Sequence, residues 1–507
     1  MAHPEPAPTE VQGPTVVRRS SMKDLAQLAL DTALQRGADY ADVRLVRYRN
    51  QNISTEDRRV ASLADTEDIG LGVRVIANGA WGFAGSCDLS REGIQACAAD
   101  AVAIAQASAM VGQSPVSLVS EPPSNRKFRT PYEIDPFTVS IEDKVGLLLE
   151  INDRLLGNDG IRKAHGFMTL RKAERIFLSS EGSDLESEVV TTNATYRATA
   201  VGDGDARYRS YEPPPLTMGY ENIDRDDLLG NTDRVAAEAV EHLKAPECEP
   251  GVTDLILDPV HLSLTIHESV GHATELDRAL GMEESLAGRS FAVPSMLRNL
   301  KYGSDMVTFR ADNTLEHGLA THGFDDEGVE GQAWNIVEDG LFVGYGTSRE
   351  VAGEIGLDRS TGTCRADHWG SIPIVRIPNL SLMPGKERCS PEEIIADTKR
   401  GIYIEGRGSF SIDQMRCNFQ FGGDAFWEIR DGKKVRMLKN VTYQSMTTDF
   451  WNSVDAIADD RFWHQGGVLN CGKGDPMQIS QMTHGACTAR VRNIQVGDAA
   501  NVTRSSG

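Results

Sequence analysis

The hydrophobic pattern in the first hundred residues alternates between helical and strand periods. Residues 22–37 carry apolar side chains at helical spacing, which predicts an amphipathic helix. Residues 41–48 and 69–86 alternate apolar and polar positions, and the second segment contains Asn78-Gly79, a dipeptide typical of tight hairpin turns. A helical pattern returns over residues 90–108. This part of the chain therefore predicts a helix, strands and a second helix.

The same two periods continue to about residue 245. Helical patterns at 141–156 and 225–244 flank a β-rich segment, residues 164–202, whose turn signals predict three or four antiparallel strands. Residues 245–251, with two prolines and a glycine, are typical of a boundary between domains. We therefore predict an N-terminal α+β domain over residues 22–245.

The second half has a different pattern. A short buried strand is expected at 253–259, and beyond residue 300 short β-like runs are separated by glycines, with one capped helix at 390–401. This pattern favours a barrel-like or sandwich β domain. The predicted fold class is α+β: an N-terminal α/β domain with an antiparallel sheet, then a mainly β, barrel-like C-terminal domain (246–507).

Composition narrows the class of protein. Residues 1–21, rich in proline and polar residues, predict a disordered N-terminal extension. The apolar runs fall short of the roughly 20 residues that span a bilayer, so no membrane association is expected. The 52 basic and 74 acidic residues give a net charge of −22, which disfavours nucleic acid as a partner. Eight scattered cysteines without a CxxC pair indicate reduced thiols and a cytoplasmic protein.

The strongest chemical candidate is the stretch HESVGHATELDR at residues 267–278. It places Glu268 beside His267, with a second histidine, His272, five residues after the first. Positions five apart diverge by about 140° on a regular helix, so both rings can face one ion only if a π-bulge interrupts the helix. Gly271 tolerates such a distortion. The alternative is a helix that carries two unrelated histidines.

A catalytic zinc site usually has three protein ligands and an open position for water. Cys471 is a strong candidate for the third ligand because it lies in a glycine-rich segment, 466–476, expected to be a loop, where Lys473 could stabilise a thiolate. The acidic run 325–327 either supports the histidines from outside or forms a solvated turn. The other candidates for the third ligand are Glu275, Asp277, His317, His322, the acidic run, His464, His484 and the remaining cysteines.

An ordered pattern runs through six segments of the chain: residues 41–48, 69–86, 267–272, 323–329, 418–434 and 471–476. In order and approximate spacing, these segments resemble the TldD/PmbA family of metalloproteases, and the similarity extends from about residue 22 onward. The resemblance implies that His267, His272 and Cys471 bind Zn²⁺ and that Glu268 is the catalytic residue. Because the chain has every ligand, it is similar to the TldD type. The resemblance also implies that the C-terminal domain carries a metal-binding helix, the one that contains His267 and His272.

The resemblance implies a zinc-dependent peptidase that hydrolyses unfolded or extended peptides, with Glu268 as the general base that activates water at the zinc. It also implies a homodimer, or a heterodimer with a paralogue that lacks the zinc motif. The glycine-rich strands near 402–424 are candidates for lining the peptide cleft. The alternative is a non-catalytic, peptide-presenting subunit of a dimeric protease with a structural metal. Modulation of gyrase or nucleic acid is disfavoured by the negative charge.

Overall fold

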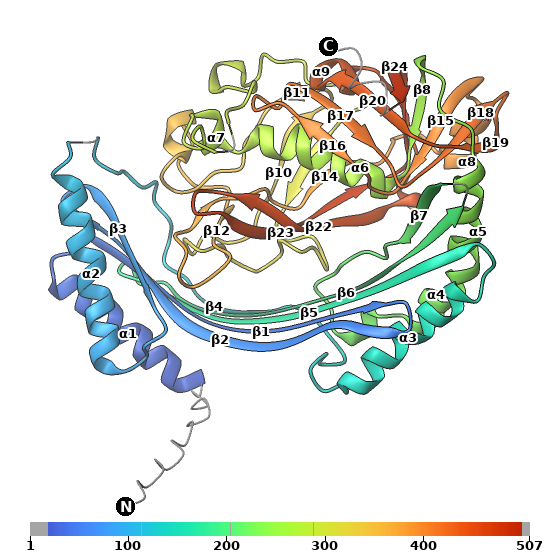
Figure 1. Ribbon diagram of the computed structural model, residues 1–507. Helices are drawn as coiled ribbons and strands as arrows, with labels where there is room; N and C mark the ends of the chain where they lie inside the picture. Colours follow the sequence, from blue (N-terminus) through green and yellow to red (C-terminus); the bar gives the residue numbers. More distant parts are fainter. Residues whose placement is uncertain (1–18, 113, 203, 287, 499–507) are drawn as a thin grey trace, which may run out of the picture.

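The computed structural model describes residues 19–498, except residues 113, 203 and 287 (Figure 1). Most of the predicted disordered extension, residues 1–18, lies outside the described residues. Its last three residues belong to helix α1 (Arg19–Gln35), so this helix begins earlier than its apolar pattern predicts.

A seven-stranded, mainly antiparallel sheet forms the N-terminal region, in the order β3-β2-β1-β5-β6-β4 with β7 paired to β6. Four of its strands are unusually long, with 17 or 19 residues each. The segment 164–202 therefore holds two long strands rather than three or four, because the alternation continues unbroken on each side of a single turn. The strands are β1 (Tyr40–Glu56), β2 (Arg59–Ala77), β3 (Ala80–Ser86), β4 (Asn125–Arg129), β5 (Ile161–Ser179), β6 (Asp184–Gly202) and β7 (Asp205–Tyr211).

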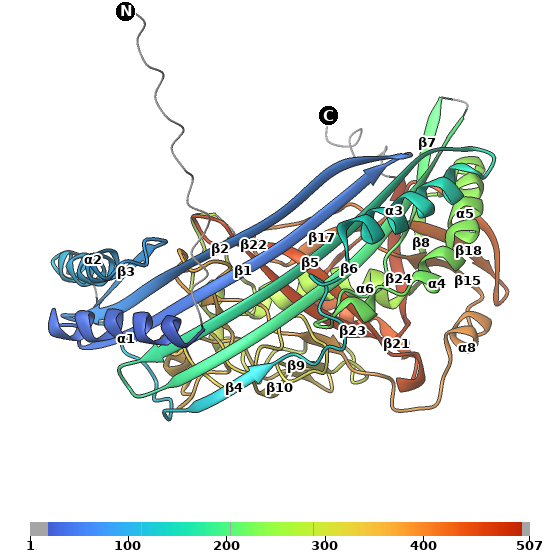
Figure 2. The same cartoon turned by 90° about the horizontal axis from the view of Figure 1, so that it is seen from below.

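Helices cover this long sheet at its two ends and leave its middle to the C-terminal region (Figures 1 and 2). Helices α1 and α2 (Arg91–Ala109) enclose one hydrophobic core. Helix α3 (Ile141–Leu156) encloses a second core with α4 (Arg225–Gly230) and α5 (Thr232–Lys244). The single helix predicted over 225–244 is two helices, because Asn231 ends one and begins the next.

A nine-stranded sheet in the C-terminal region curls into a half-barrel, in the order β16-β17-β20-β24-β8-β15-β18-β19 with β21 paired to β24. The fold is therefore α+β with a barrel-like second half, as predicted. Its strands are β8 (Gly251–Leu257), β15 (Arg400–Glu405), β16 (Phe410–Ile412), β17 (Asn418–Gly422), β18 (Ala425–Arg430), β19 (Lys433–Leu438), β20 (Val441–Met446), β21 (Val454–Ile457) and β24 (Ala489–Asp498).

Smaller elements complete this region. Helix α8 (Pro391–Ala396) has the predicted Ser390–Glu393 capping box, but it ends five residues before the predicted end because strand β15 begins at Arg400. The other elements are β9 (Phe309–Asp312), β10 (Ala333–Glu338), β11 (Leu341–Phe342), β12 (Cys364–Arg365), β13 (Ile374–Val375), β14 (Leu380–Leu382), the hairpin β22 (His464–Lys473) and β23 (Gln478–Ala486), helix α9 (Thr447–Asn452), and 3-10 turns at Tyr220–Asn222, Pro294–Met296, Ala352–Ile355 and Asp460–Phe462.

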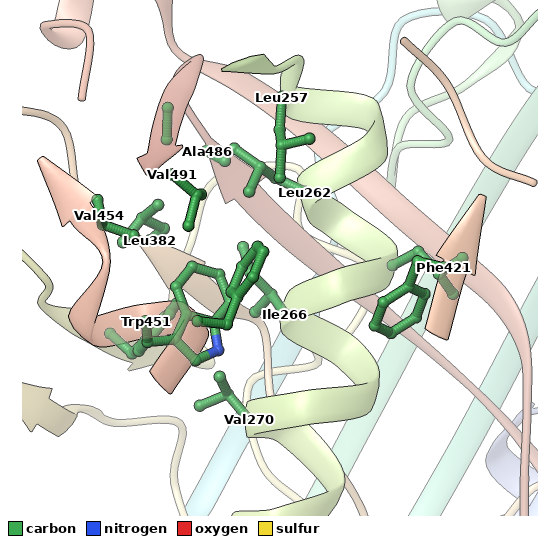
Figure 3. Packing of buried hydrophobic residues seen from close by; sticks show 14 of the residues in the cluster. Leu257, Leu262, Ile266, Val270, Leu382, Phe421, Trp451, Val454, Ala486 and Val491 are labelled. Atoms are coloured by element: carbon green, nitrogen blue, oxygen red, sulfur yellow. The ribbon is translucent and has the colours of Figure 1, made fainter. Parts of the chain in front are cut away.

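Helix α6 (Pro259–Ile266) runs through the core of the half-barrel. The Asp258 side chain caps its first turn by accepting the His261 N–H, and Pro259 occupies its first position. Leu262, Ile266 and Val270 point into the core that contains Trp451 (Figure 3). This close packing fixes the position of the residues that follow the helix, beginning with His267. No helix among the described residues is long and apolar enough to cross a membrane.

Candidate metal centre

Helix α6 continues into a π-helical turn, as expected if the two histidines, five residues apart, face one ion. The wider turn returns both imidazole rings to one side, with their centroids 4.8 Å apart. A Cβ atom at Gly271 would lie 2.9 Å from Ile377 Cδ1, so glycine allows this turn to pack against its neighbour. The π turn is His267–Gly271, and it is followed by a 3-10 turn (His272–Thr274) and helix α7 (Leu276–Ala279).

Cys471 approaches the two histidines from strand β22. Its Sγ lies 3.5 Å from His272 Nε2, and the potential ligand atoms of Cys471, His267 and His272 all lie within 4.8 Å of one another. The predicted loop is wrong, because the glycine-rich segment pairs with β23 as far as Lys473, with a register shift just before Cys471. The structure thus brings the three predicted ligands together from positions about 200 residues apart, since His272 and Cys471 are separated by 199 residues.

The donor set fits a metal ion. Burial lowers the pKa of His267 to about 4 and also lowers the pKa of His272, so both rings are neutral near pH 7 and offer lone pairs. Burial opposes ionisation of the Cys471 thiol, whereas the positive charge of the Arg376 guanidinium lowers the pKa of the thiol. Two neutral imidazoles and a thiolate are ligands that zinc accepts.

Hydrogen bonds on the far sides of the rings fix which nitrogen faces the centre. His484 Nδ1 donates to the Leu380 carbonyl (2.8 Å), so its Nε2 accepts from His267 Nδ1 (2.9 Å). His272 Nδ1 donates to Glu275 Oε2 (2.8 Å). The Nε2 lone pair of each candidate ligand is therefore left for a metal. His484 and Glu275, two of the alternative third ligands, orient the histidines instead.

The thiolate is stabilised by Arg376 rather than by Lys473. Arg376 is fully buried, and its Nη2 lies 3.3 Å from Cys471 Sγ and 2.5 Å from the Cys471 carbonyl oxygen. Lys473 Nζ instead contacts Glu275 Oε1 (3.2 Å) and both carboxylate oxygens of Asp277 (2.7 and 2.8 Å). Lys473 therefore does not contact the thiolate; it pairs with Glu275, the residue that orients His272.

Glu268 lies beside the ligands and is held by an arginine that the motif does not contain. Its Oε2 accepts from Arg416 Nη1 at 2.6 Å. Arg416 comes from the connection between β16 and β17 and has a φ of +62°, a left-handed conformation that is uncommon outside glycine. Both side chains are largely buried, with relative exposures of 14% for Arg416 and 8% for Glu268. The structure therefore presents the predicted base with one carboxylate oxygen already engaged.

The acidic run Asp325–Glu327 has neither of its expected roles. All three residues are buried, so the run is not a solvated turn. Asp326 pairs with Arg175 (2.9 Å) and Glu327 with Arg74 (3.1 Å), and both arginines belong to the N-terminal sheet. The run therefore joins the two halves of the molecule rather than supporting the ligand histidines.

Comparison with known proteins covers nearly the whole chain. Residues 41–105, 134–245 and 250–498 match family models described as PmbA/TldA metallopeptidase domain 1, central domain and C-terminal domain. A metalloprotease of Methanocaldococcus jannaschii is 28% identical over 90% of this chain and 97% of that protein. A zinc metalloprotease TldD homolog of Saccharolobus solfataricus is 23% identical over 91% of this chain and 97% of its own length.

Solved structures share the fold. A putative modulator of DNA gyrase from Bacteroides thetaiotaomicron superposes with a TM-score of 0.74 at 16% identity, covering 95% of this chain and 99% of that one. TldE from Thermococcus kodakarensis superposes with a TM-score of 0.71 at 16% identity, covering 94% and 99%. At this identity the likeness concerns the arrangement of the elements.

Proposed function

The chain belongs to the PmbA/TldD metallopeptidase family, and from this premise we propose that it is a zinc-dependent peptidase that hydrolyses unfolded or extended peptides. The observation that carries the proposal is the convergence of His267, His272 and Cys471 beside the carboxylate of Glu268. The name of the Saccharolobus relative supports zinc as the metal. The proposed division into residues 22–245 and 246–507 assigns all four residues to the second domain.

Zinc bound by the two imidazoles and the thiolate would supply the positive charge that acidifies water and polarises a peptide carbonyl. The protein's own groups then move the proton. Arg416 holds Oε2 of Glu268, which leaves Oε1 to accept a proton from the attacking water and to deliver it to the departing amine. Arg376 and His484 keep the ligands in their binding forms throughout, because neither the thiolate nor the His267 tautomer can change without breaking a buried contact.

The proposed peptide site is next to Glu268. Strand β16 forms one edge of the nine-stranded sheet, and the turn that follows it carries Arg416. Phe410 and Met415 are 50% and 41% exposed at this edge. An extended peptide can add to an exposed strand edge through main-chain hydrogen bonds, which makes binding tolerant of sequence. This placement supports residues 402–424 as part of the cleft. We further propose a cytoplasmic homodimer, or a heterodimer with a paralogue that lacks the zinc motif.

The test compares wild type with Glu268→Ala on an unstructured peptide. We expect the rate of cleavage to fall by about 10²–10⁴-fold while the metal content stays the same, because only the proton acceptor is lost. Glu284→Ala is the matched control, since Glu284 pairs with Arg289 on the exposed surface. Equal cleavage by wild type and Glu268→Ala, or no cleavage by metal-loaded wild type, would reject the peptidase. The second result would favour a peptide-presenting subunit with a structural metal.

A further inference from the structure

A cavity of about 320 Å³ lies between the N-terminal and C-terminal regions, and none of the proposed metal ligands lines it. One wall comes from the end of β7 and from α4 and α5. The opposite wall comes from the start of α6, the end of β15 and the start of β22. The volume is at the lower end of the range for small-ligand sites, so it fits a single side chain or chain terminus. We call this space the acidic cavity.

Two buried aspartates line the acidic cavity with incomplete partners. Asp424 is 3% exposed; its Oδ2 accepts from Arg209 and from the Ser210 N–H (2.8 Å), whereas its Oδ1 has no hydrogen-bond partner. Asp258 is 6% exposed, and its Oδ1 accepts the N–H groups of His261 (2.7 Å) and Gly406 (3.0 Å). Across residues 19–498, gaps aside, no ion pair joins Asp258 to a cationic side chain. Leaving a buried carboxylate oxygen unpaired is costly, so Asp424 Oδ1 indicates a missing donor.

The cations around the cavity are already engaged. The Arg209 guanidinium contacts Glu238, Glu405 and Asp424, and the Arg407 guanidinium contacts Glu212 and the Gly467 carbonyl. Five carboxylates line the cavity against three guanidinium groups. Burial, together with the nearby Glu405 carboxylate, raises the pKa of Asp258 to about 7. Burial also raises the pKa of Asp424 to about 6, although its contact with Arg209 lowers it. The lining carboxylates are Glu212, Asp227, Asp258, Glu405 and Asp424, and the guanidinium groups belong to Arg209, Arg234 and Arg407.

We propose that the acidic cavity binds a primary ammonium group of the peptide substrate, either its amino terminus or a lysine side chain. An ammonium group is compact and has three donors, which suits carboxylate oxygens spread over several walls. The ring of Tyr211 and the neighbouring Pro213 and Pro214 supply an apolar wall for methylene groups. A bare metal ion is disfavoured, because among the described residues the metal-sized cluster is His267, His272 and Cys471. This inference rests on the proposed peptidase function.

Helix α6 and strand β22 both run from the cavity toward the proposed metal ligands. Val260, in the first turn of α6, lines the cavity, and His267 follows seven residues later, which is about 10 Å at 1.5 Å per helical residue. His464 lines the cavity from the start of β22, the strand that carries Cys471. An extended peptide advances about 3.3 Å per residue, so a peptide amino terminus in the cavity would lie about three residues from the scissile bond.

The experiment measures binding without turnover. Zinc-loaded Glu268→Ala protein is titrated with unstructured peptides that carry a fluorophore at the carboxyl terminus. One lysine-free peptide has a free amino terminus, a second is acetylated, and a third series is acetylated with one lysine moved along the chain. We expect the first peptide, or one member of the lysine series, to bind about tenfold more tightly than the acetylated, lysine-free peptide. Which of them gains affinity identifies the source of the ammonium group.

A second substitution assigns the effect to the cavity. Adding Asp424→Asn keeps an acceptor for Arg209 but removes the charge, and should reduce the tenfold preference to less than about twofold. Asp326→Asn is the matched control, because it removes a buried, arginine-paired carboxylate outside the cavity and should keep the preference. Equal affinity for free and acetylated peptides, or equal loss in both variants, would overturn the proposal. If the Asp424→Asn variant fails to fold, the comparison of free and acetylated peptides in the Glu268→Ala protein still tests the ammonium site. If wild type does not hydrolyse peptides, only the proposed peptidase function is rejected, and the binding result stands.

Discussion

The proposed metal centre and a group of ion pairs that we call the charged seam are both largely buried, yet their polar groups are arranged in opposite ways. The charged seam consists of Arg44, Arg74 and Arg175 of the N-terminal sheet with Asp42, Asp326 and Glu327. There each charge meets an opposite charge: burial would lower the pKa of the Arg74 guanidinium, but Asp42 and Glu327 raise it well above its ordinary value. In the proposed metal centre, protein groups bond the outer nitrogens of His267 and His272, and the Nε2 lone pairs that lie near Cys471 are left for a metal. Burial is common to both regions, so burial alone does not indicate a site. What indicates a site is that potential ligand atoms converge on one point.

Removing a metal-binding atom from the proposed metal centre should have the largest effect on metal content and activity. Cys471→Ser replaces the thiolate by a hydroxyl group, a poor ligand for zinc at neutral pH. We expect the bound metal to be lost and peptide cleavage to fall by at least about 10²-fold, the scale on which even outer partners of metal ligands act. Metal content by mass spectrometry and cleavage of an unstructured peptide measure the two effects. Glu327→Gln in the charged seam is the control and should keep both metal and activity per folded molecule. A Cys471→Ser protein with full metal and full activity would contradict the assignment.

Removing a charge from the seam should affect stability instead. Arg74→Met leaves Asp42 and Glu327 buried without their counter-charge, and we expect the free energy of unfolding to fall by about 3–5 kcal/mol with the metal content unchanged. Arg126→Met is the matched control, because Arg126 pairs with Glu330 on the exposed surface and should cost less than about 1 kcal/mol. Urea unfolding of the metal-loaded proteins measures both. Similar losses in the two variants would mean that the seam does not stabilise the junction.

The difference between the two regions also explains what the sequence could predict. The spacing of His267 and His272 is local, so helix geometry predicts a π turn on the condition that both rings face one ion, and the structure contains that turn. The alternation of apolar residues likewise predicts most of the helices and strands. Arg376, Arg416 and His484 could not be found in this way, because each reaches the centre from a distant strand or turn and has no motif of its own. The burial of Asp326 could not be predicted for the same reason, since its partners Arg44 and Arg175 come from the other half of the molecule.

The smallest expected effect is a pH dependence of stability, and it distinguishes two histidines of the same helical segment, His261 and His267. Burial lowers the pKa of both to about 4, but only His261 is satisfied by protein groups on both ring nitrogens. Its Nδ1 donates to the Gly406 carbonyl (2.9 Å), and its Nε2 accepts from the Tyr443 hydroxyl (2.8 Å). Protonation would remove that acceptor inside the core. The cost of charging His261 therefore does not depend on metal, whereas the state of His267 does.

The sign of the pH effect at His261 follows from its two pKa values. The folded value, about 4, is below the unfolded value of about 6.5, so the neutral ring stabilises the fold fully above about pH 6.5 and loses this contribution as the pH falls toward 4. His261→Gln keeps a donor and an acceptor but cannot be protonated. In metal-free proteins, we expect the stability advantage of wild type over His261→Gln to shrink by about 2 kcal/mol between pH 7 and pH 4.5, measured by urea unfolding. A difference that stays constant would show that burial does not hold His261 neutral, and that the two histidines differ for another reason than their partners.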